Sequence, residues 1–365
     1  MRLALRELVR KPLRFAVAGT ALLVLTVLLL FLGALLDGLY LGSTGVLRSQ
    51  SAELITFSSD ARNSLVRSRI DPEVRTQVEQ VDGVASAAGL GVALVGAEVP
   101  GESELADAAV VGYEQVTGDI PAPPGPGEAY ADRSLERSGV VIGDRIGLGP
   151  TRYPVTVEGW VDDANFLLQG GLWVEPGTWR EVLGASRPDS VLPDGTFQAL
   201  VVTTDPGADP TAVAAAIDAT TGGSTDTLTR DDAVLALPGI KEQNSTFTSI
   251  ISTTLFVAGL VIALFFALLT LERVGMYAVL KAIGGSTAQI FAGVVTQAVV
   301  VAAVSFAVGA AVVYALSPVL TDALPFQLVG SRTVATFVLL LVTSVVGSVI
   351  SLRRVIKVDP ASAIG

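Results

Sequence analysis

Four long apolar stretches without a charged side chain constrain the fold of this sequence more than any other feature. Each is long enough to cross the hydrocarbon core of a bilayer as a helix, which takes about 20 residues. One soluble domain of this size does not need four such stretches for its core, so we predict four transmembrane helices. The stretches are Phe15–Leu36, Ile250–Leu271, Ile290–Ala315 and Val334–Leu352.

Small and hydroxylated residues recur inside these stretches, and such residues let membrane helices approach one another closely. We therefore expect them at helix–helix contacts. They are Gly19, Thr26, Gly33, Ser305, Gly309, Ser344, Gly347 and Ser348.

The charges predict how the chain is oriented in the membrane. A mean hydropathy of +0.59 and a net charge of −11 rarely occur together in a soluble protein, and indicate apolar spans combined with an acidic watery domain. Residues 41–249 carry more than twice as many acidic as basic side chains, whereas the short flanking segments are basic. Basic segments remain on the cytoplasmic side. We predict cytoplasmic segments at 1–14, 272–289 and 353–365, transmembrane helices at 15–40, 250–271, 290–316 and 334–352, and extracytoplasmic segments at 41–249 and 317–333.

The segments at the membrane surface and outside it show further patterns. Residues 1–14 alternate leucine with arginine, which suits an amphipathic helix along the inner membrane surface or only a basic flank. Residues 41–249 mix strand-like runs with helices that begin at Asp-Pro pairs, and we expect a third helix over 229–245 to lead into the second span. The fold class is therefore a multi-pass α-helical membrane protein with a large α+β extracytoplasmic domain between its first two helices. The expected strands are 52–57, 108–113, 153–161 and 197–204, and the Asp-Pro helices start at Asp71 and Asp209.

Several kinds of chemistry are excluded by composition. The chain has no cysteine and no histidine, which removes thiol nucleophiles, Cys/His zinc sites and catalytic triads with a histidine base. It also lacks the glycine-rich phosphate loop of ATPases. The acidic pairs Asp162-Asp163 and Asp231-Asp232 do not stand at a recognisable metal-ligand spacing. We predict no catalytic residue, no metal site, no cofactor and no nucleic-acid partner.

The connector between the second and third spans is more structured than a plain loop. Apolar residues alternate there with Glu272, Arg273 and Lys281, and Gly284-Gly285 then turns the chain. This pattern predicts a short helix that exposes a partly apolar knob, a shape that suits docking into a groove on another protein.

At this connector the sequence resembles the FtsX/MacB-like permease domain of ABC transporters. An E-R pair ends the second span in that family and an L-K-A-[IL]-G motif follows; they match Glu272, Arg273, Leu280, Lys281, Ala282, Ile283 and Gly284. The tail "LRRVIKVDPASAIG" resembles the family's basic ending, and "ADRSLERSGVVIGDRIGL" resembles part of its periplasmic core domain. Length and N-terminal region are most similar to the short DevC/heme-exporter-like permeases.

The resemblance implies partners and a location. It implies a homodimer in a bacterial cell membrane with two cytoplasmic ABC ATPase subunits, which bind the ATP and Mg²⁺, docked beneath the seven motif residues. Nucleotide-driven closure of the ATPases would then move the spans and rock the outer domain, a process called mechanotransmission. Membrane lipids, and an extracytoplasmic adaptor or hydrolase, would be further partners.

Two functions follow from the resemblance. The first is export of a hydrophobic or amphiphilic molecule (lipid, heme, peptide or drug), held near the outer ends of the first two spans by Asp37, Tyr40, Glu53, Phe247 and Phe256. With no histidine present, Tyr40 and the carboxylates would be the available heme ligands, although Tyr40 also suits an interfacial anchor. The second is a non-transporting FtsX-type regulator whose outer domain activates a cell-wall hydrolase or a sensor. An intramembrane enzyme ranks last, because no catalytic motif lies within the spans.

Overall fold

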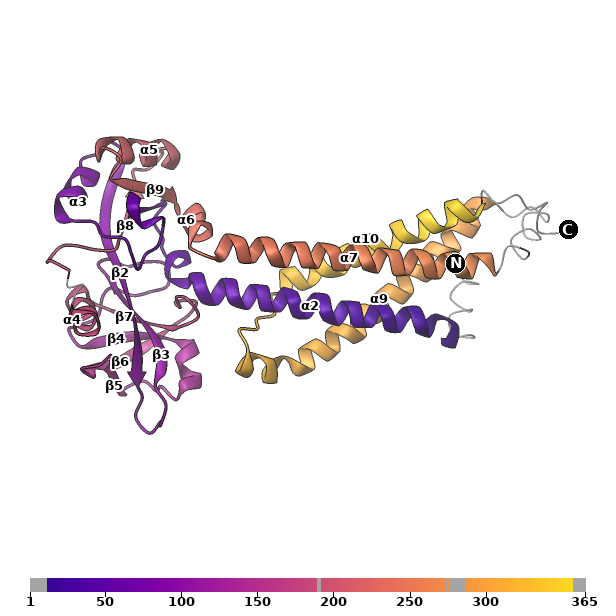
Figure 1. Cartoon of the computed structure of the whole chain (residues 1–365), viewed down its shortest axis with the longest axis horizontal. Helices are drawn as coiled ribbons and strands as arrows, with labels where there is room; N and C mark the ends of the chain where they lie inside the picture. The colour runs from indigo at the N-terminus through magenta and orange to yellow at the C-terminus, as the bar shows by residue number, and fades with distance from the viewer. Residues whose placement is uncertain (1–11, 189–191, 273–274, 276–285, 357–365) are drawn as a thin grey trace. The chain divides into compact units, whose positions relative to one another are not determined.

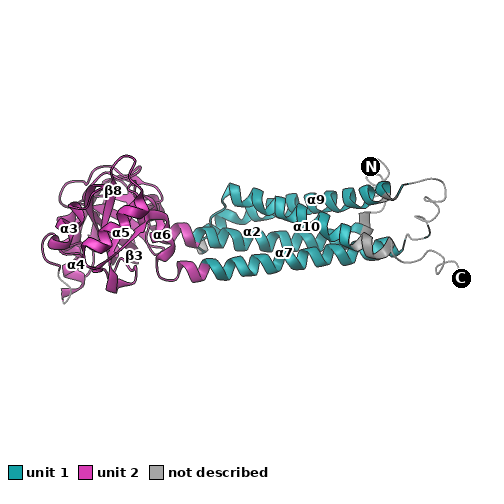
Figure 2. Ribbon diagram, turned by 90° about the horizontal axis from the view of Figure 1, so that it is seen from above, with its two compact units in different colours: residues 1–38, 244–365 teal, residues 39–243 magenta. Residues whose placement is uncertain are grey.

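The structure is a computed structural model that describes residues 12–188, 192–272, 275 and 286–356. The chain forms two compact units. One comprises residues 39–243, called the outer domain below, and the other comprises residues 1–38 with 244–365, called the helical unit (Figure 2).

The helical unit contains the four helices that the sequence predicts to cross a membrane. They are α2 (Pro12–Arg48), α7 (Ile240–Leu271), α9 (Thr287–Ala323) and α10 (Gly330–Ile356), and each carries a stretch long and apolar enough to span a bilayer (Figure 1). Between them lies a buried apolar core that includes Leu22, Ala258, Ala302 and Leu340. The four-helix prediction is therefore confirmed.

The helices are longer than the apolar stretches that predicted them. Helix α2 continues to Arg48, past the predicted end at 40, and α9 continues to Ala323, through Pro318. Pro318 has no amide to donate to the carbonyl of Tyr314, but the Ser317 hydroxyl donates to that carbonyl at 2.8 Å. The helix thus continues past the proline. The α9–α10 connection is consequently 324–329, shorter than the predicted 317–333.

The outer domain is built on a mixed sheet of nine strands within the described residues, in the order β3-β7-β4-β6-β5-β2-β8-β1-β9. Strand β2 also pairs with β3, so the strands from β2 to β7 close into a ring, while β8, β1 and β9 extend from the first half of β2. The strands are β1 (Leu54–Ser58), β2 (Val84–Glu98), β3 (Ala106–Tyr113), β4 (Glu128–Asp132), β5 (Arg145–Leu148), β6 (Tyr153–Val161), β7 (Gly170–Val174), β8 (Ala199–Thr204) and β9 (Thr225–Thr229).

Short helices accompany the sheet, and the predicted α+β class is confirmed. The predicted strands at 52–57, 108–113, 153–161 and 197–204 correspond to β1, β3, β6 and β8. Asp71 and Asp209 stand at the N-caps of α3 and α5, as predicted. The helices are α3 (Pro72–Glu79), α4 (Pro176–Ser186), α5 (Pro210–Thr220) and α6 (Arg230–Ala236), with 3₁₀ turns at Ser59–Ala61 and Arg133–Ser138.

The prediction of one helix over 229–245 is wrong, because the chain breaks there. Helix α6 ends at Ala236, and α7 begins at Ile240. Leu237 precedes Pro238 and has the extended conformation (φ −52°, ψ 133°) that a following proline ring enforces. Gly239 then turns the chain at a φ of +89°.

Glycines in β2 and β3 make room for the largest side chains of the outer-domain core. Gly91 and Gly112 pair across the two strands, and a Cβ on either would lie within 2.6 Å of the buried Trp179. Trp179 stacks on Phe197 with 5.8 Å between ring centroids. The sheet can therefore hold α4 close against its surface only because side chains are absent at these two positions.

Candidate functional site

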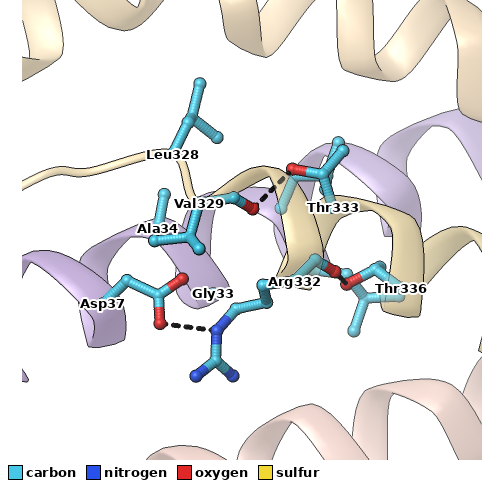
Figure 3. Close-up of a pocket in the computed structure, with 10 residues that line it drawn as sticks. Gly33, Ala34, Asp37, Leu328, Val329, Arg332, Thr333 and Thr336 are labelled. Atoms are coloured by element: carbon cyan, nitrogen blue, oxygen red, sulfur yellow. Dashed lines mark hydrogen bonds and ion pairs between the residues drawn. The ribbon is translucent and has the colours of Figure 1, made fainter.

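An ion pair between a buried aspartate and a partly exposed arginine joins two distant parts of the helical unit. Asp37, on α2, is buried, and its Oδ1 accepts a hydrogen bond from Nε of Arg332 at 2.6 Å (Figure 3). Arg332 stands in the first turn of α10, 295 positions further along the chain. A Cβ at Gly33 would lie 3.2 Å from Cδ of Arg332, so this glycine lets the arginine side chain run along α2.

The loop before α10 is held against the same part of α2. The amide of Gln327 donates to the carbonyl of Ala34 at 3.0 Å. Phe326 is buried, with its ring centroid 5.7 Å from that of Phe31. A Cβ at Gly38 would lie 2.1 Å from the carbonyl oxygen of Pro325, so only glycine allows this approach. These contacts and the ion pair, here called the α2–α10 latch, attach the α9–α10 connection to the first helix.

The latch encloses a cavity of about 10 Å³. That is about the space of a single water molecule, and therefore too small for a transported substrate. The second carboxylate oxygen of Asp37 is buried and has no hydrogen-bond partner among the described residues. The geometry thus suits a structural connection between helices better than a substrate site.

A larger opening lies elsewhere in the helical unit, between α2 and α7. It is an open groove of about 700 Å³, and Thr20 is the one hydroxyl-bearing residue in its lining. A groove of this size and polarity can take a hydrophobic molecule or an acyl chain. The lining residues are Ala16, Val17, Thr20, Ala21, Val24, Leu25, Val257 and Val261.

Small residues bring the helices together, as predicted. The Ser305 hydroxyl on α9 donates to the carbonyl of Gly19 on α2 at 2.9 Å. A Cβ at Gly309 would lie 2.9 Å from Cγ2 of Thr26, and one at Gly347 would lie 2.8 Å from the Gly259 carbonyl oxygen. Backbones approach this closely in membranes because the association of helices depends on packing rather than on the release of water.

The predicted substrate residues occupy different environments. Asp37 belongs to the latch, and the Tyr40 ring lies partly buried against the outer-domain core. The Glu53 carboxylate accepts a hydrogen bond from the backbone amide of Thr204 at 3.0 Å. On α7, Phe247 is half-buried and Phe256 is 66% exposed. The polar partner of Asp37 is Arg332, which lay in a predicted loop and was not among the predicted site residues.

The predicted coupling motif lies almost entirely outside the described residues. Glu272 directly follows α7 and is exposed. The rest of the motif, and the predicted amphipathic helix over 1–14 as far as residue 11, are not described. Helix α9 then begins with a capping box, in which Ser286 and Gln289 bond to each other's backbone amides. The undescribed motif residues are Arg273, Leu280, Lys281, Ala282, Ile283 and Gly284.

The two acidic pairs of the outer domain are engaged in local contacts. Asp162 pairs with Arg133 at 3.0 Å, and Asp163 pairs with Arg48 at 3.0 Å. Asp232 accepts a hydrogen bond from the Thr229 hydroxyl at the start of α6. Within the described part of the chain, no cluster of three or more acidic residues has the arrangement of a metal site.

A polar cleft of about 510 Å³ lies beside α3 in the outer domain. Arg75 bridges Glu79 at 2.9 Å and Glu114 at 2.8 Å. Burial alone would lower the pKa of Arg75, but the hydrogen bonds and charges of the two glutamates raise it above its usual value. Glu114 also accepts a hydrogen bond from the Gly89 amide at 2.6 Å. These contacts connect α3 to β2 and engage all three charged side chains that line the cleft.

Comparison with known proteins gives a family match for the C-terminal part of the chain. Residues 248–360 match the family described as FtsX-like permease C-terminal. A putative hemin transport system permease protein, HrtB, of Staphylococcus epidermidis is 24% identical over 38% of this chain and 40% of its own length. An uncharacterized ABC transporter permease of Mycobacterium bovis is 39% identical over 30% of this chain and 31% of its own length. The matched stretches thus span less than half of these curated relatives.

Among solved structures, the periplasmic region of MacB from Actinobacillus actinomycetemcomitans aligns with 52% of this chain and 92% of its own length, at 11% identity and a TM-score of 0.35. The extracellular domain of YknZ from Gram-positive bacteria aligns with 48% of this chain and 98% of its own length, at 14% identity and a TM-score of 0.34. The predicted resemblance to the FtsX-like permeases is confirmed by the match over residues 248–360.

Proposed function

We propose that the chain is an ABC transporter permease and an export subunit for a hydrophobic or amphiphilic molecule, because residues 248–360 match the FtsX-like permease C-terminal family. Membership in this family implies a cytoplasmic ATPase partner, which would bind and hydrolyse the ATP. This chain would supply the membrane path and the motion. The relatives named as permeases support the transport role.

The observation that carries the proposal is the open apolar groove between α2 and α7. Its walls contain no charged side chain, and it opens on helix faces that expose large apolar residues, such as Val17 and Leu260. A hydrophobic molecule dissolved in the membrane is not hydrated, so it could enter the groove without a cost for removing water from its surface. The open side would be closed by lipid or, in the proposed homodimer, by a second copy of the chain.

The connectivity of the chain supports transmission of motion between the units. The chain enters the outer domain through α2 and leaves it through α7, and each helix is continuous across the boundary between the units. A continuous helix transmits a push along its axis better than a flexible linker does. An ATPase docked at 272–284 would act directly on the end of α7, and from there on the outer domain.

Heme is one candidate cargo, since the staphylococcal relative is named as a hemin transport permease. Of the residues predicted as heme ligands, Asp37 is engaged by Arg332 and Glu53 by a backbone amide. Tyr40 remains as an oxygen ligand. The apolar groove has no ligand for iron in its lining and would accept other amphiphiles equally well.

The coupling step is tested by co-purifying the chain with its ATPase in nanodiscs. Wild-type chain should capture one ATPase per permease, and a Lys281→Glu, Ala282→Asp variant should lose it. Lys241→Glu is the matched control, because it reverses one exposed lysine at the opposite end of α7 and should keep the ATPase. Capture that persists in the double variant would place the docking site elsewhere.

The transport step is tested by filling the groove. An Ala21→Trp variant should retain the ATPase but lose stimulation of ATP hydrolysis by added hemin or lysophosphatidylcholine. Equal stimulation in the variant and the wild type would remove the groove from the transport path. Hydrolysis that responds to neither probe, but does respond to an added cell-wall hydrolase, would favour the regulator over the exporter.

A further inference from the structure

Two adjacent leucines form an exposed turn beside the end of α2. Phe166 and Gln169 bond to each other through both backbone amides at 3.0 Å, which leaves Leu167 and Leu168 at the tip of a two-residue turn. Leu167 is 41% exposed, and Leu168 is 50% exposed. We call these two residues the leucine tip.

The backbone of the leucine tip is in a conformation that leucine rarely adopts. Leu167 has a φ of +49° and Leu168 a φ of +67°, in the left-handed region. Two-residue turns with both central residues at positive φ strongly favour Asn-Gly or Asp-Gly. Strained backbone of this kind points to a function for the side chains that occupy it. Here the side chains are large, apolar and about half exposed.

The tip is attached to α2 by backbone hydrogen bonds. The amide of Leu168 donates to the carbonyl of Gly42 at 2.9 Å, and the amide of Leu167 donates to that of Ser43 at 3.2 Å. Glycines again allow the approach, because a Cβ at Gly42 would lie 2.9 Å from Cδ2 of Leu168, and one at Gly45 would lie 2.5 Å from the carbonyl oxygen of Asp163. The tip therefore stays level with residues 42 and 43 of this helix.

Those two helix positions belong to the candidate membrane span of α2, near its outer-domain end. Gly42 and Ser43 fall within the candidate span Phe15–Arg48 and follow the end of the uncharged run at Leu36 by six and seven residues. This part of α2 also carries Tyr40, with Arg48 held 5.9 Å from the centroid of its ring. Tyrosine and arginine are characteristic of the water–lipid boundary.

The base of the turn is rigid, so the tip is presented in one position. Phe166 is buried in the core of the outer domain. The amide of Ala164 donates to the buried carboxylate of Asp132 at 2.8 Å. The carbonyl of Ala164 accepts a hydrogen bond from the Trp173 indole at 3.0 Å. A turn that is anchored in this way cannot fold its leucines back into the protein core.

We propose that the leucine tip inserts into the outer lipid leaflet and anchors the outer domain to the membrane surface beside α2. The occupant is lipid because the tip is bonded to the end of a membrane-spanning helix, which places its side chains at the boundary between headgroups and acyl chains. Insertion would remove two leucines from water and hold the domain at one height above the bilayer.

The absence of cysteine from the sequence allows a direct test with a single probe. A Leu168→Cys variant of the full chain is labelled with the fluorophore NBD and reconstituted in nanodiscs that contain nitroxide-labelled phosphatidylcholine. Leu105→Cys, an exposed apolar position in another loop of the outer domain, is the matched control. Because an interfacial side chain lies within about 5–10 Å of the headgroup–acyl boundary, we expect quenching roughly threefold stronger at Leu168 than at Leu105.

A second labelled variant, Leu167→Cys, tests whether the label at position 168 distorts the turn. The label at position 167 should be quenched to the same extent as the label at position 168. Tryptophan emission, to which Trp173 contributes through an indole that bonds to the base of the turn, reports whether the loop is intact. With the loop intact, quenching at both leucines no stronger than at Leu105 would overturn the proposal. Blue-shifted emission that lipid nitroxides do not quench would also overturn it, since the tip would then be covered by protein, such as a second copy of the chain.

Discussion

The two units of this chain differ in how they satisfy their hydroxyl groups. In the helical unit, hydroxyls mostly donate to the carbonyl four residues earlier in the same helix, as Thr26, Thr254 and Ser344 do. In the outer domain they also connect segments far apart, as Thr56 does with Thr227 and Thr117 with Gln50. A bilayer offers no water to a side chain that loses its partner, so bonds within one helix are favoured there.

The units also differ in where their large apolar residues lie. The helices expose Val17, Leu264 and Val319 by 65% or more, whereas Trp173 and Trp179 of the outer domain are fully buried. The outer domain is therefore stabilised by the removal of apolar surface from water. The helical unit has a lipid-facing apolar surface and depends on close packing and a few polar contacts. Substitutions should consequently act through different mechanisms in the two units.

The largest effect is expected in the outer-domain core. Trp179→Ala should lower the free energy of unfolding of the outer domain by about 3–5 kcal/mol, because it leaves a cavity between Phe197 and the glycines of β2 and β3. Denaturant unfolding followed by the emission of the remaining tryptophans measures it. Trp160→Phe, at a half-buried position, is the control and should cost much less. If Trp179→Ala destabilised the helical unit by a comparable amount, the two units would not be stabilised independently, and the distinction between them would fail.

The next effect concerns the α2–α10 latch. Asp37→Asn removes the charge that holds Arg332, whose side chain is 43% exposed, so we discount the cost of a fully buried pair to roughly 1–3 kcal/mol. In a chain with Leu328→Cys as its single cysteine, the alkylation rate should rise about 5- to 140-fold as the loop opens, since 1.4 kcal/mol corresponds to a factor of ten.

The matched control for the latch is an exposed ion pair in the other unit. Asp162→Asn removes the partner of Arg133, but both side chains are more than half exposed, so the alkylation rate at Leu328→Cys should not change. An unchanged rate in the Asp37→Asn chain as well would show that Gly38 and the Gln327–Ala34 hydrogen bond hold the loop without the charge.

Local signals predicted the four spans and part of the outer-domain elements, whereas the contacts between distant segments were not predictable from them. Uninterrupted apolar runs indicated the four spans, and Asp-Pro pairs marked the starts of two helices. Strand β2 was missed because its glycines lower strand propensity, and their purpose becomes visible only once Trp179 packs against them. Arg332 was missed for a similar reason: nothing local to it indicates a partner 295 positions earlier.

The same limitation applies to the leucine tip. Residues 167 and 168 read as two ordinary leucines in a loop, since neither glycine nor asparagine marks a tight turn there. Their positive φ angles and their bonds to Gly42 and Ser43 depend on the fold of the whole outer domain. The predicted coupling motif shows the reverse situation, because it is a prediction from sequence alone and lies outside the residues that the structure describes, apart from Glu272.

The smallest expected effect compares one helix cap from each unit. Glu175 is the N-cap residue of α4. Its carboxylate accepts hydrogen bonds from the amides of Gly177 and Thr178 at 2.8 and 2.6 Å. Burial alone would raise the pKa of Glu175, but these hydrogen bonds outweigh it and lower the pKa below the ordinary 4.5. The stabilisation is therefore complete above the unfolded-state pKa and is lost as the pH falls through the lower pKa of the folded state.

Glu175→Gln should thus cost about 1 kcal/mol of outer-domain stability at pH 7, and less as the pH falls below the ordinary glutamate pKa. The matched variant in the helical unit is Ser286→Ala, which removes a neutral cap from α9. It should cost a similar amount, about 1 kcal/mol, at every pH, because neither Ser286 nor Gln289 titrates. Thermal unfolding of both variants between pH 3 and pH 7 makes the comparison. If the two losses followed the same pH profile, the charge on Glu175 would not be what stabilises the start of α4, and its cap would act only through hydrogen bonds, like the cap of Ser286.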